Sequence, residues 1–173
     1  MACSKLNRFS LGRTCKILSE GGSRVGNFDT LAAMYSLRPY QQQAVDATVH
    51  YFRTHKSPAC IVLPTGAGKS LCYQIPAIAS RQRTVVISPL VALMDDQVSV
   101  LKDLGIQAER IHSGRERSEN VASWKRFHCD TGKLLYMSPE RLMTEKMLAA
   151  INGLDIGMIV VDEAHCISKW GPS

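Results

Sequence analysis

The sequence lacks a hydrophobic run long enough to cross a bilayer, an internal repeat and any closely spaced pair of cysteines. Its longest apolar runs, such as residues 158–161, are far shorter than the roughly 20 residues that a membrane helix needs. The 12 glycines follow no period, which excludes a fibrous repeat. With 45% hydrophobic and 21% charged residues, the 173-residue chain is also unlike a disordered protein. The composition therefore predicts one soluble globular domain with a buried core.

The cysteines are scattered along the chain. They are Cys3, Cys15, Cys60, Cys72, Cys129 and Cys166. Because there is no Cys-x-x-Cys motif and no Cys/His quartet, the sequence does not predict a zinc site. No apolar signal-peptide core precedes these residues, so we expect reduced thiols in an intracellular protein.

Positive charge is concentrated at the N-terminus. The formal net charge is +6, yet residues 1–27 alone contain five basic side chains and one acidic side chain. We interpret residues 1–27 as a basic, poorly ordered tail that ends in a turn-rich linker, and residues 28–173 as one domain. An organelle-targeting segment is the alternative for the tail, although it lacks a clean amphipathic stripe. The basic balance by itself is weak support for nucleic-acid binding.

Beyond the tail, short apolar runs alternate with helical patterns. The apolar runs predict strands at residues 59–63, 84–88, 133–137 and 158–162. These runs are continuous instead of alternating, which is typical of parallel strands buried on both faces. Helices are predicted at residues 40–52, 90–104, about 121–127 and 138–151, with Gly105 capping the second. The alternation predicts an α/β fold with a doubly wound, mostly parallel sheet.

A glycine-rich stretch joins the first predicted strand to a predicted helix. It reads Leu63-Pro64-Thr65-Gly66-Ala67-Gly68-Lys69-Ser70. Gly66 and Gly68 let the backbone curl so that its N–H groups face a phosphate, and the helix N-terminus adds to that attraction. Lys69 can reach the β- and γ-phosphates of a nucleotide, and the Ser70 hydroxyl can ligate Mg²⁺. Leu63 stands where the strict pattern has glycine, so the stretch is a variant phosphate-binding loop.

Two adjacent carboxylates follow the last predicted strand. In a parallel sheet, Asp162 and Glu163 would lie at the carboxyl edge, where ligands of such folds bind. Asp162 would hold Mg²⁺ through water, and Glu163 would orient and deprotonate an attacking water. An Asp-Glu pair alone is a common solvated turn. Together with the phosphate-binding loop, in this order, it predicts hydrolysis of a nucleoside triphosphate.

Five stretches of the chain together resemble the RecQ family of DNA helicases, over about residues 37–171. They are Leu37-Arg38-Pro39-Tyr40-Gln41 and residues 66–76, 88–98, 136–142 and 162–171. The stretches beyond the phosphate-binding loop are specific, because generic ATPases do not share them. The resemblance implies a RecA-like fold of the P-loop NTPase type, in which residues 28–173 form the first, ATP-binding motor domain.

The resemblance implies an ATP-dependent helicase that moves 3′ to 5′ on DNA in recombination, repair and replication. It implies ATP and Mg²⁺ as cofactors, single-stranded DNA and duplex junctions as partners, no membrane, and a bacterial nucleoid or a eukaryotic nucleus as location. It assigns nucleotide binding to Arg38, Gln41, Thr65, Gly66, Ala67, Gly68, Lys69 and Ser70, and catalysis to Lys69, Asp162, Glu163 and His165. It assigns DNA contacts to Ser88, Pro89, Ser138, Arg141 and Trp170.

Two of these assignments have alternatives in the local sequence, and the two tryptophans are predicted to differ. Ser138 before Pro139 is also typical of a simple helix cap. His165 can be a hydrogen-bonded structural histidine. Trp170 can stack on bases, whereas Trp124, at helical spacing with apolar neighbours, is predicted to be a core residue.

Related ATPase folds insert a further strand between the phosphate-loop strand and the strand that ends at Asp162. The sequence stops soon after Gly171, so we expect a sheet that is incomplete at its C-terminal side, with a gap beside that strand. We expect this chain to hold the ATP-binding half of a motor, to bind nucleotide weakly and not to unwind duplexes alone. The alternatives are a non-catalytic nucleotide- or DNA-binding fragment and a different P-loop ATPase, such as a nucleotide kinase.

Overall fold

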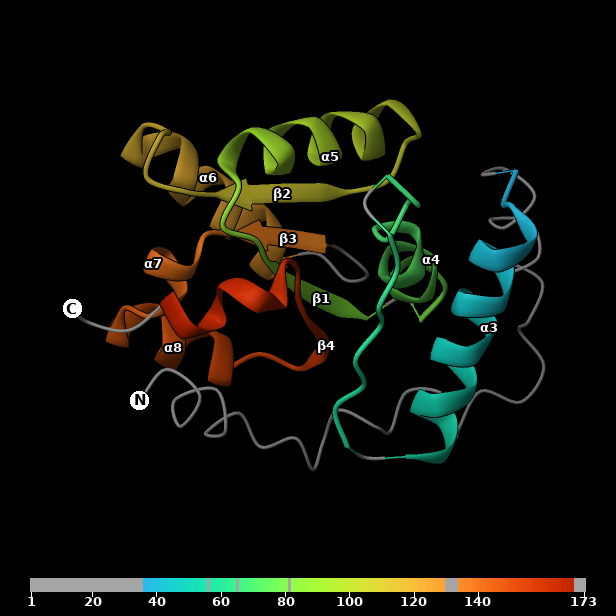
Figure 1. Cartoon of the computed structure of the whole chain (residues 1–173). Coiled ribbons are helices and arrows are strands. Elements are labelled where there is room, and N and C mark those ends of the chain that lie inside the picture. Colours follow the sequence, from blue (N-terminus) through green and yellow to red (C-terminus); the bar gives the residue numbers. More distant parts are fainter. Residues whose placement is uncertain (1–35, 56, 65, 81, 130–133, 170–173) are drawn as a thin grey trace.

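The computed structural model describes residues 36–169, except 56, 65, 81 and 130–133. Four strands form one sheet, with bounds β1 (Arg83–Ile87), β2 (Ala108–Ile111), β3 (Leu134–Met137) and β4 (Ile156–Val161). Their order is β2-β3-β1-β4 and every pair is parallel (Figure 1). The predicted α/β fold with a parallel sheet is confirmed.

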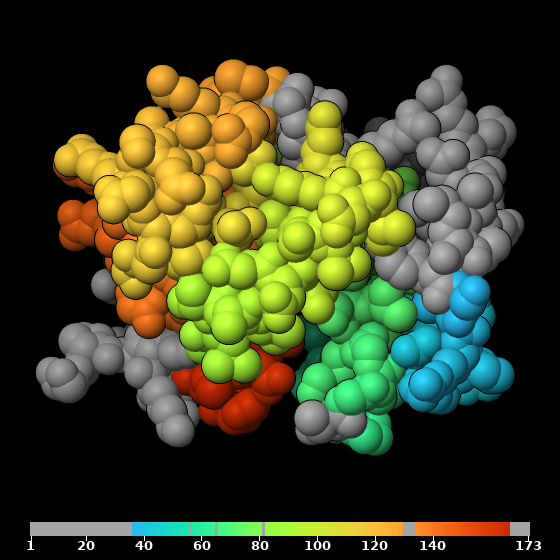
Figure 2. Space-filling model, turned by 90° about the horizontal axis from the view of Figure 1, so that it is seen from above, coloured from blue at the N-terminus to red at the C-terminus, as the bar shows by residue number. Residues whose placement is uncertain are grey.

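Helices cover both faces of this sheet (Figure 1). Their bounds are α3 (Pro39–Thr54), α4 (Leu71–Ser80), α5 (Val91–Asp103), α6 (Arg117–Cys129), α7 (Pro139–Leu142), α8 (Glu145–Asn152) and the 3-10 helix η2 (Ala164–Lys169). Side chains of α4 and α5 pack on one face of the sheet, and side chains of α6, α7 and α8 pack on the other. Figure 2 looks down on α5, with α6 to one side and α3, in blue, to the other.

The central strand shows why the apolar runs are continuous. Val86 points to the face covered by α4 and α5, whereas Val85 and Ile87 point to the face covered by α6, α7 and α8. All three side chains are fully buried. Both faces of the strand therefore need apolar residues, as expected for a parallel strand between two helical layers.

The predicted strand at residues 59–63 is wrong. Residues 59–64 form no regular secondary structure, and Ile61 and Val62 are 39% and 86% exposed. A strand needs a neighbour for its backbone hydrogen bonds. In the described part of the chain, β4 is an edge strand and no strand lies between it and residues 59–63. This arrangement agrees with the gap expected beside the strand that ends at Asp162.

Two other elements differ from the prediction. Strand β2 was not predicted, because Glu109 and Arg110 interrupt its apolar pattern. The single helix predicted at residues 138–151 is divided into α7 and α8. The division is at Thr144, whose hydroxyl accepts a hydrogen bond from the backbone N–H of Met147 at 3.4 Å and so caps α8.

The cap predicted at Gly105 is confirmed. Gly105 has a φ of +73°, its N–H donates to the carbonyl of Lys102, and the N–H of Ile106 donates to the carbonyl of Leu101. These two bonds form a Schellman motif, in which a left-handed residue after the helix satisfies its last carbonyls. The motif turns the chain from α5 into β2. Among the described residues, no helix is both long enough and apolar enough to span a membrane.

Candidate functional site

The candidate site residues gather at the carboxyl edge of the sheet, where backbone hydrogen bonds tie the strand ends together. The N–H of Ser88 donates to the carbonyl of Met137 at 3.1 Å, and the N–H of Asp162 donates to the carbonyl of Ile87 at 2.8 Å. The N–H of Ser138 donates to the carbonyl of Ile111 at 3.2 Å. The residues that follow β1, β3 and β4 are therefore fixed relative to one another.

The phosphate-binding loop curls through two left-handed glycines. Gly66 and Gly68 have φ values of +78° and +75°, a region in which residues with a side chain are strained. The N–H of Ala67 donates to the carbonyl of Pro64 at 3.1 Å, and the N–H of Leu71 donates to the carbonyl of Gly68 at 3.1 Å. The loop thus closes one turn and passes directly into α4, as predicted.

Helix α3 supports this loop through Gln41. The Gln41 side-chain amide donates to the carbonyl of Ala67 at 2.8 Å, and its Oε1 accepts from the N–H of Arg38 at 2.9 Å. A methyl group added to Gly68 would lie 2.4 Å from Nε2 of Gln41. Gln41 therefore contacts the phosphate-binding loop directly, and its role in reading adenine stays a prediction.

The acidic pair lies within electrostatic reach of this loop. The pKa of Asp162 is raised, mainly by burial and further by the charge of Glu163. Two influences act in the opposite direction: the backbone N–H of Glu163, which donates to Oδ1 of Asp162 at 3.0 Å, and the charge of Lys69. Glu163 itself has a φ of +50°, which is strained for a residue with a side chain. Lys69 and the carboxylates, predicted from two distant motifs, are thus brought together.

Tyr73 on α4 lies near the same groups. Burial raises the pKa of the Tyr73 hydroxyl well above its usual range, and nearby Tyr136 and Asp162 raise it further, whereas the Ser70 side chain lowers it. Ser70, Tyr73 and Asp162 therefore share one neighbourhood. Sequence reasoning missed Tyr73, because an aromatic residue in an apolar helix is read as ordinary core.

Oxygen donors at this place suit a magnesium ion. Mg²⁺ prefers carboxylate and hydroxyl or water oxygens and binds through one or two protein carboxylates together with substrate phosphates. The Ser70 hydroxyl at the start of α4 and the Asp162 carboxylate are of this kind. The donor chemistry of the two residues therefore fits the ion that the resemblance implies.

The residues predicted to contact DNA include two buried polar atoms without a partner. Ser138 is the N-cap of α7, yet its hydroxyl makes no cap hydrogen bond. Its Oγ, and Nε of Arg141 one turn later, are buried and have no hydrogen-bond partner among the described residues. Such groups are rare in folded proteins. The helix-cap alternative therefore does not account for the Ser138 hydroxyl.

The other predicted site residues lie nearby in different environments. The Ser88 hydroxyl accepts from the N–H of Leu90 at 3.4 Å, and Pro89 is half-buried beside it. The side chain of His165 is 74% exposed, and its Nδ1 lies 3.2 Å from Oε2 of Glu163. Arg38 is exposed and donates to the Tyr40 hydroxyl at 3.4 Å.

Thr65 and Trp170 lie outside the described residues. Trp124, predicted as core, is partly buried and packs against the apolar cluster beneath α6, α7 and α8.

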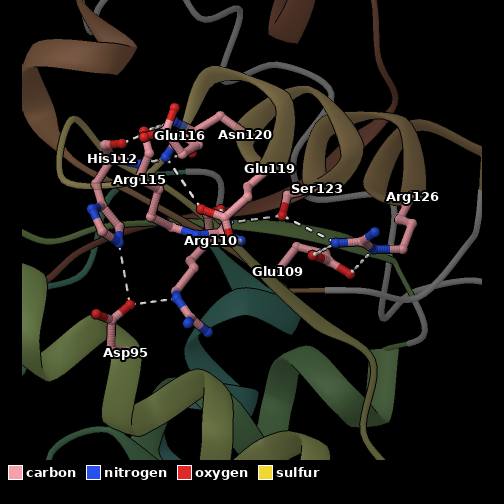
Figure 3. Close-up of polar contacts among 10 residues, drawn as sticks. All are labelled: Asp95, Glu109, Arg110, His112, Arg115, Glu116, Glu119, Asn120, Ser123 and Arg126. Atoms are coloured by element: carbon pink, nitrogen blue, oxygen red, sulfur yellow. Dashed lines mark hydrogen bonds and ion pairs between the residues drawn. The ribbon is translucent and has the colours of Figure 1, made fainter.

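A polar cluster that the sequence did not reveal holds the connection after β2 (Figure 3). The side chain of Asn120 donates to the carbonyl of His112 at 2.9 Å and accepts from the His112 N–H at 3.3 Å. Nε2 of His112 lies 3.2 Å from Asp95, which also pairs with Arg110. These bonds tie α5, β2 and α6 together near the carboxyl edge.

The comparison with known families defines the class of this chain. Residues 38–173 match the DEAD/DEAH box helicase family. This match covers most of the sequence, and the chain belongs to that family.

Within this class, the chain is similar to bacterial RecQ helicases and to eukaryotic helicases of the Q series. The chain is 44% identical to the ATP-dependent DNA helicase RecQ of Bacillus subtilis over 116 residues, which is 67% of this chain and 20% of that protein. It is 40% identical to the RecQ helicase of Pasteurella multocida over 146 residues, 83% of this chain and 22% of that protein. With the rat ATP-dependent DNA helicase Q5 the identity is 39% over 140 residues, 77% of this chain and 14% of that protein.

The RecQ resemblance seen in the sequence is thereby confirmed. The chain spans about a fifth of the length of the bacterial relatives that it matches.

Proposed function

We propose that this chain binds ATP with Mg²⁺ and forms the nucleotide-binding part of a RecQ-type DNA helicase. The whole protein would use ATP hydrolysis to move 3′ to 5′ on single-stranded DNA at duplex junctions, in recombination, repair and replication. It would act inside the cell where DNA is held, in a bacterial nucleoid or a eukaryotic nucleus. The observation that carries the proposal is the loop of two left-handed glycines that leads through Lys69 and Ser70 into α4, in a chain similar to RecQ helicases.

Each residue at the site has a distinct task in this proposal. The loop N–H groups and Lys69 would hold the phosphates, and Ser70 and Asp162 would hold Mg²⁺, which when bound would supply positive charge to the phosphates. Glu163 orients the attacking water and accepts its proton. His165, which lies next to the Glu163 carboxylate, would couple ATP hydrolysis to DNA binding.

DNA binding is proposed for the loops that follow β1 and β3. The Ser138 hydroxyl and the Arg141 guanidinium carry buried polar atoms without partners at the carboxyl edge, which suits a backbone phosphate. Ser88 and Pro89 lie on the neighbouring strand end, and Trp170 would stack on a base. Phosphate contacts of this kind give affinity that is independent of sequence and falls with salt.

The test measures Mg²⁺-dependent binding of a fluorescent ATP analogue and ATP hydrolysis with and without single-stranded DNA. Lys69→Ala is expected to weaken nucleotide binding by roughly tenfold or more. Glu163→Gln is expected to bind nucleotide but to lower hydrolysis by about 10²–10⁴-fold, the usual contribution of a general base. Lys146→Ala, at an exposed position on α8, is the matched control and should change neither. Normal hydrolysis in both site variants would refute the proposal.

One observation favours a non-catalytic nucleotide- or DNA-binding role for this chain alone. In the segment that leads into the phosphate-binding loop, Ile61 and Val62 are exposed and no described residue of it pairs with the sheet, so the loop lacks the strand that was predicted before it. Binding without turnover would support this role. Turnover stimulated by DNA would support a motor, and turnover indifferent to DNA would support a different P-loop ATPase. In a strand-displacement assay, we expect no unwinding by the 173-residue chain.

A further inference from the structure

A chain of polar side chains runs through the core between α4, α5 and β3. The side-chain amide of Gln74 donates to Oε1 of Gln97 at 2.6 Å and to the Tyr136 hydroxyl at 2.8 Å. Gln74 and Tyr136 are only 4% and 1% exposed. An amide nitrogen carries two hydrogens. Both acceptors can therefore be served at once only while α4, α5 and β3 keep their present positions.

Packing alone does not require these polar groups. Tyr136 belongs to an apolar cluster with Val86, Met94, Val98 and Leu134, where phenylalanine would fill nearly the same volume. Methionine has nearly the shape of glutamine and needs no hydrogen bond. Because burying amide and hydroxyl groups costs free energy that their bonds only offset, the polar network calls for a reason other than stability.

The three elements lead to different parts of the site. Gln74 lies one turn after Ser70 on the helix that opens at the phosphate-binding loop. Tyr136 stands two residues before Ser138, and α5, which carries Gln97, begins just after Pro89. Tyr73, next to Gln74, lies near both Tyr136 and Asp162. The network thus joins the nucleotide side of the site to both loops proposed to grip DNA.

We propose that Gln74, Gln97 and Tyr136 are positioning residues that couple nucleotide binding to DNA binding. The inference rests on the proposed function, since it requires that the chain bind both ligands. A nucleotide pulls on the first turn of α4 through Lys69 and Ser70. A small shift of α4 moves the Gln74 amide away from one acceptor or the other, and β3 and α5 follow in order to restore both bonds. The loops at Ser138 and Ser88 move with them.

The test measures the coupling factor between the two ligands. The affinity of a labelled oligothymidylate is measured by fluorescence anisotropy, with and without a saturating non-hydrolysable ATP analogue and Mg²⁺. Coupling factors of about 5–150 are usual for such linked sites. In the wild-type chain, we expect the analogue to change DNA affinity by a factor in this range. In Gln74→Met and Tyr136→Phe, we expect the factor to fall to near one while each ligand alone binds within about threefold of wild type.

Two further variants make the result specific. Gln107→Met, at an exposed position before β2, should retain wild-type coupling. Gln97→Met tests the half-buried end of the network, where a substitution disturbs the core less than at Gln74 or Tyr136. Thermal unfolding of each variant shows whether it is folded. The double variant Gln74→Met/Tyr136→Phe should have about the same coupling factor as either single variant, since both residues belong to one network.

The outcomes separate the two proposals. Wild-type coupling in the folded Gln74, Gln97 and Tyr136 variants would overturn the network and leave the proposed function standing. The network would also be overturned, and the proposed function would stand, if both ligands bind the wild-type chain and neither changes the affinity of the other. If the wild-type chain binds neither ligand, the proposed function fails and the network falls with it.

Discussion

Gly68 lies where the phosphate-binding loop passes Gln41, and this contact makes its missing side chain testable. Gly66 and Gly68 share nearly the same left-handed backbone, but only Gly68 has a side chain against it. Gly68→Ala should therefore combine backbone strain of about 1–2 kcal/mol with a clash against Gln41. We expect it to weaken binding of Mg²⁺ and an ATP analogue by at least tenfold, measured by calorimetric titration.

Gly66→Ala is the matched control. An added methyl group at Gly66 meets no atom within 4 Å, so only the backbone strain remains. We expect a loss of binding several times smaller than for Gly68→Ala. Equal losses in the two variants would show that the contact with Gln41 does not matter.

Asp162 is predicted to reduce stability in the absence of nucleotide. Burial raises its pKa, so the folded chain holds this proton to a higher pH than the unfolded chain, and stability from this group falls as pH rises above about 4. Asp162→Asn should raise Tm at pH 7 by about 2–4 °C, as for roughly 1 kcal/mol in a chain of this size. The gain should disappear towards pH 3, where the carboxyl is protonated in both states.

The same variant should lose the stabilisation that ligand gives. Mg²⁺ with an ATP analogue raises the Tm of a chain that binds it in proportion to the logarithm of ligand concentration. Calorimetric scans are expected to show this rise for wild type and little for Asp162→Asn. A lower Tm for the ligand-free variant would contradict the sign assigned to Asp162.

The reactive residues were predicted from residue type and motif alone, and their roles stay predictions. Lys69, Ser70, Asp162 and Glu163 need no knowledge of their neighbours to be recognised as phosphate or metal ligands. What the sequence could not reveal is what the side chains touch. The unpartnered hydroxyl of Ser138 depends on packing between segments far apart in the chain.

At the scale of elements, an ion pair between Glu109 and Arg126 links β2 to α6. Arg126 donates from Nε and Nη2 to the two oxygens of Glu109 at 2.6 and 2.9 Å. Burial acts to raise the pKa of Glu109, but hydrogen bonds from Arg126 and Ser123 and the charges of Lys102 and Arg126 outweigh it, and the pKa is lowered. The pair therefore stabilises the fold above the unfolded pKa of Glu109 and loses this effect as pH falls.

Removing the arginine leaves a buried carboxylate with fewer donors. Arg126→Gln is expected to lower the free energy of unfolding by about 1–3 kcal/mol at pH 7, measured by urea titration. The difference from wild type should shrink below about pH 4. Lys125→Gln, at the exposed neighbouring position, should stay within about 0.5 kcal/mol of wild type.

The elements were predictable where local pattern and tertiary burial agree. The strands β1 and β3 are buried apolar runs, β4 is a partly buried apolar run, and α5 ends at a left-handed glycine, so these elements can be recognised from the local sequence. Strand β2 was missed because its charged residues are held by ion pairs with α5 and α6 that only the fold supplies. Residues 59–63 have strand composition but no neighbour, and strand formation depends on the neighbour.

At the scale of the whole molecule, the β4 edge of the sheet favours self-association of the chain. The last four residues of β4 are half-exposed. Ile61 and Val62, which precede the phosphate-binding loop in the sequence, are also exposed. Unpaired strand edges and exposed apolar side chains favour contact with other chains. We expect the isolated chain to self-associate at tens of micromolar, and Val62→Lys to reduce this, measured by sedimentation velocity. Val121→Lys, an exposed valine on α6, is the control and should not reduce it.

The overall architecture was predictable only in part. Alternating strands and helices predict the fold class, because crossover connections force parallel pairing. The order β2-β3-β1-β4 was not predicted, since β1 pairs with strands about 50 and 70 residues later in the sequence. No local signal records such a distant pairing.

That strand order determines when each strand can pair with its neighbours during translation. Among the strands of the described residues, β1, an interior strand of the sheet, is synthesised first, and its two neighbours β3 and β4 are synthesised last. No hairpin can shelter it in the meantime, because every pairing is parallel. The apolar residues of β1 therefore stay without a strand partner while about 50 further residues are synthesised, which makes this segment a target of chaperones that bind unfolded polypeptide.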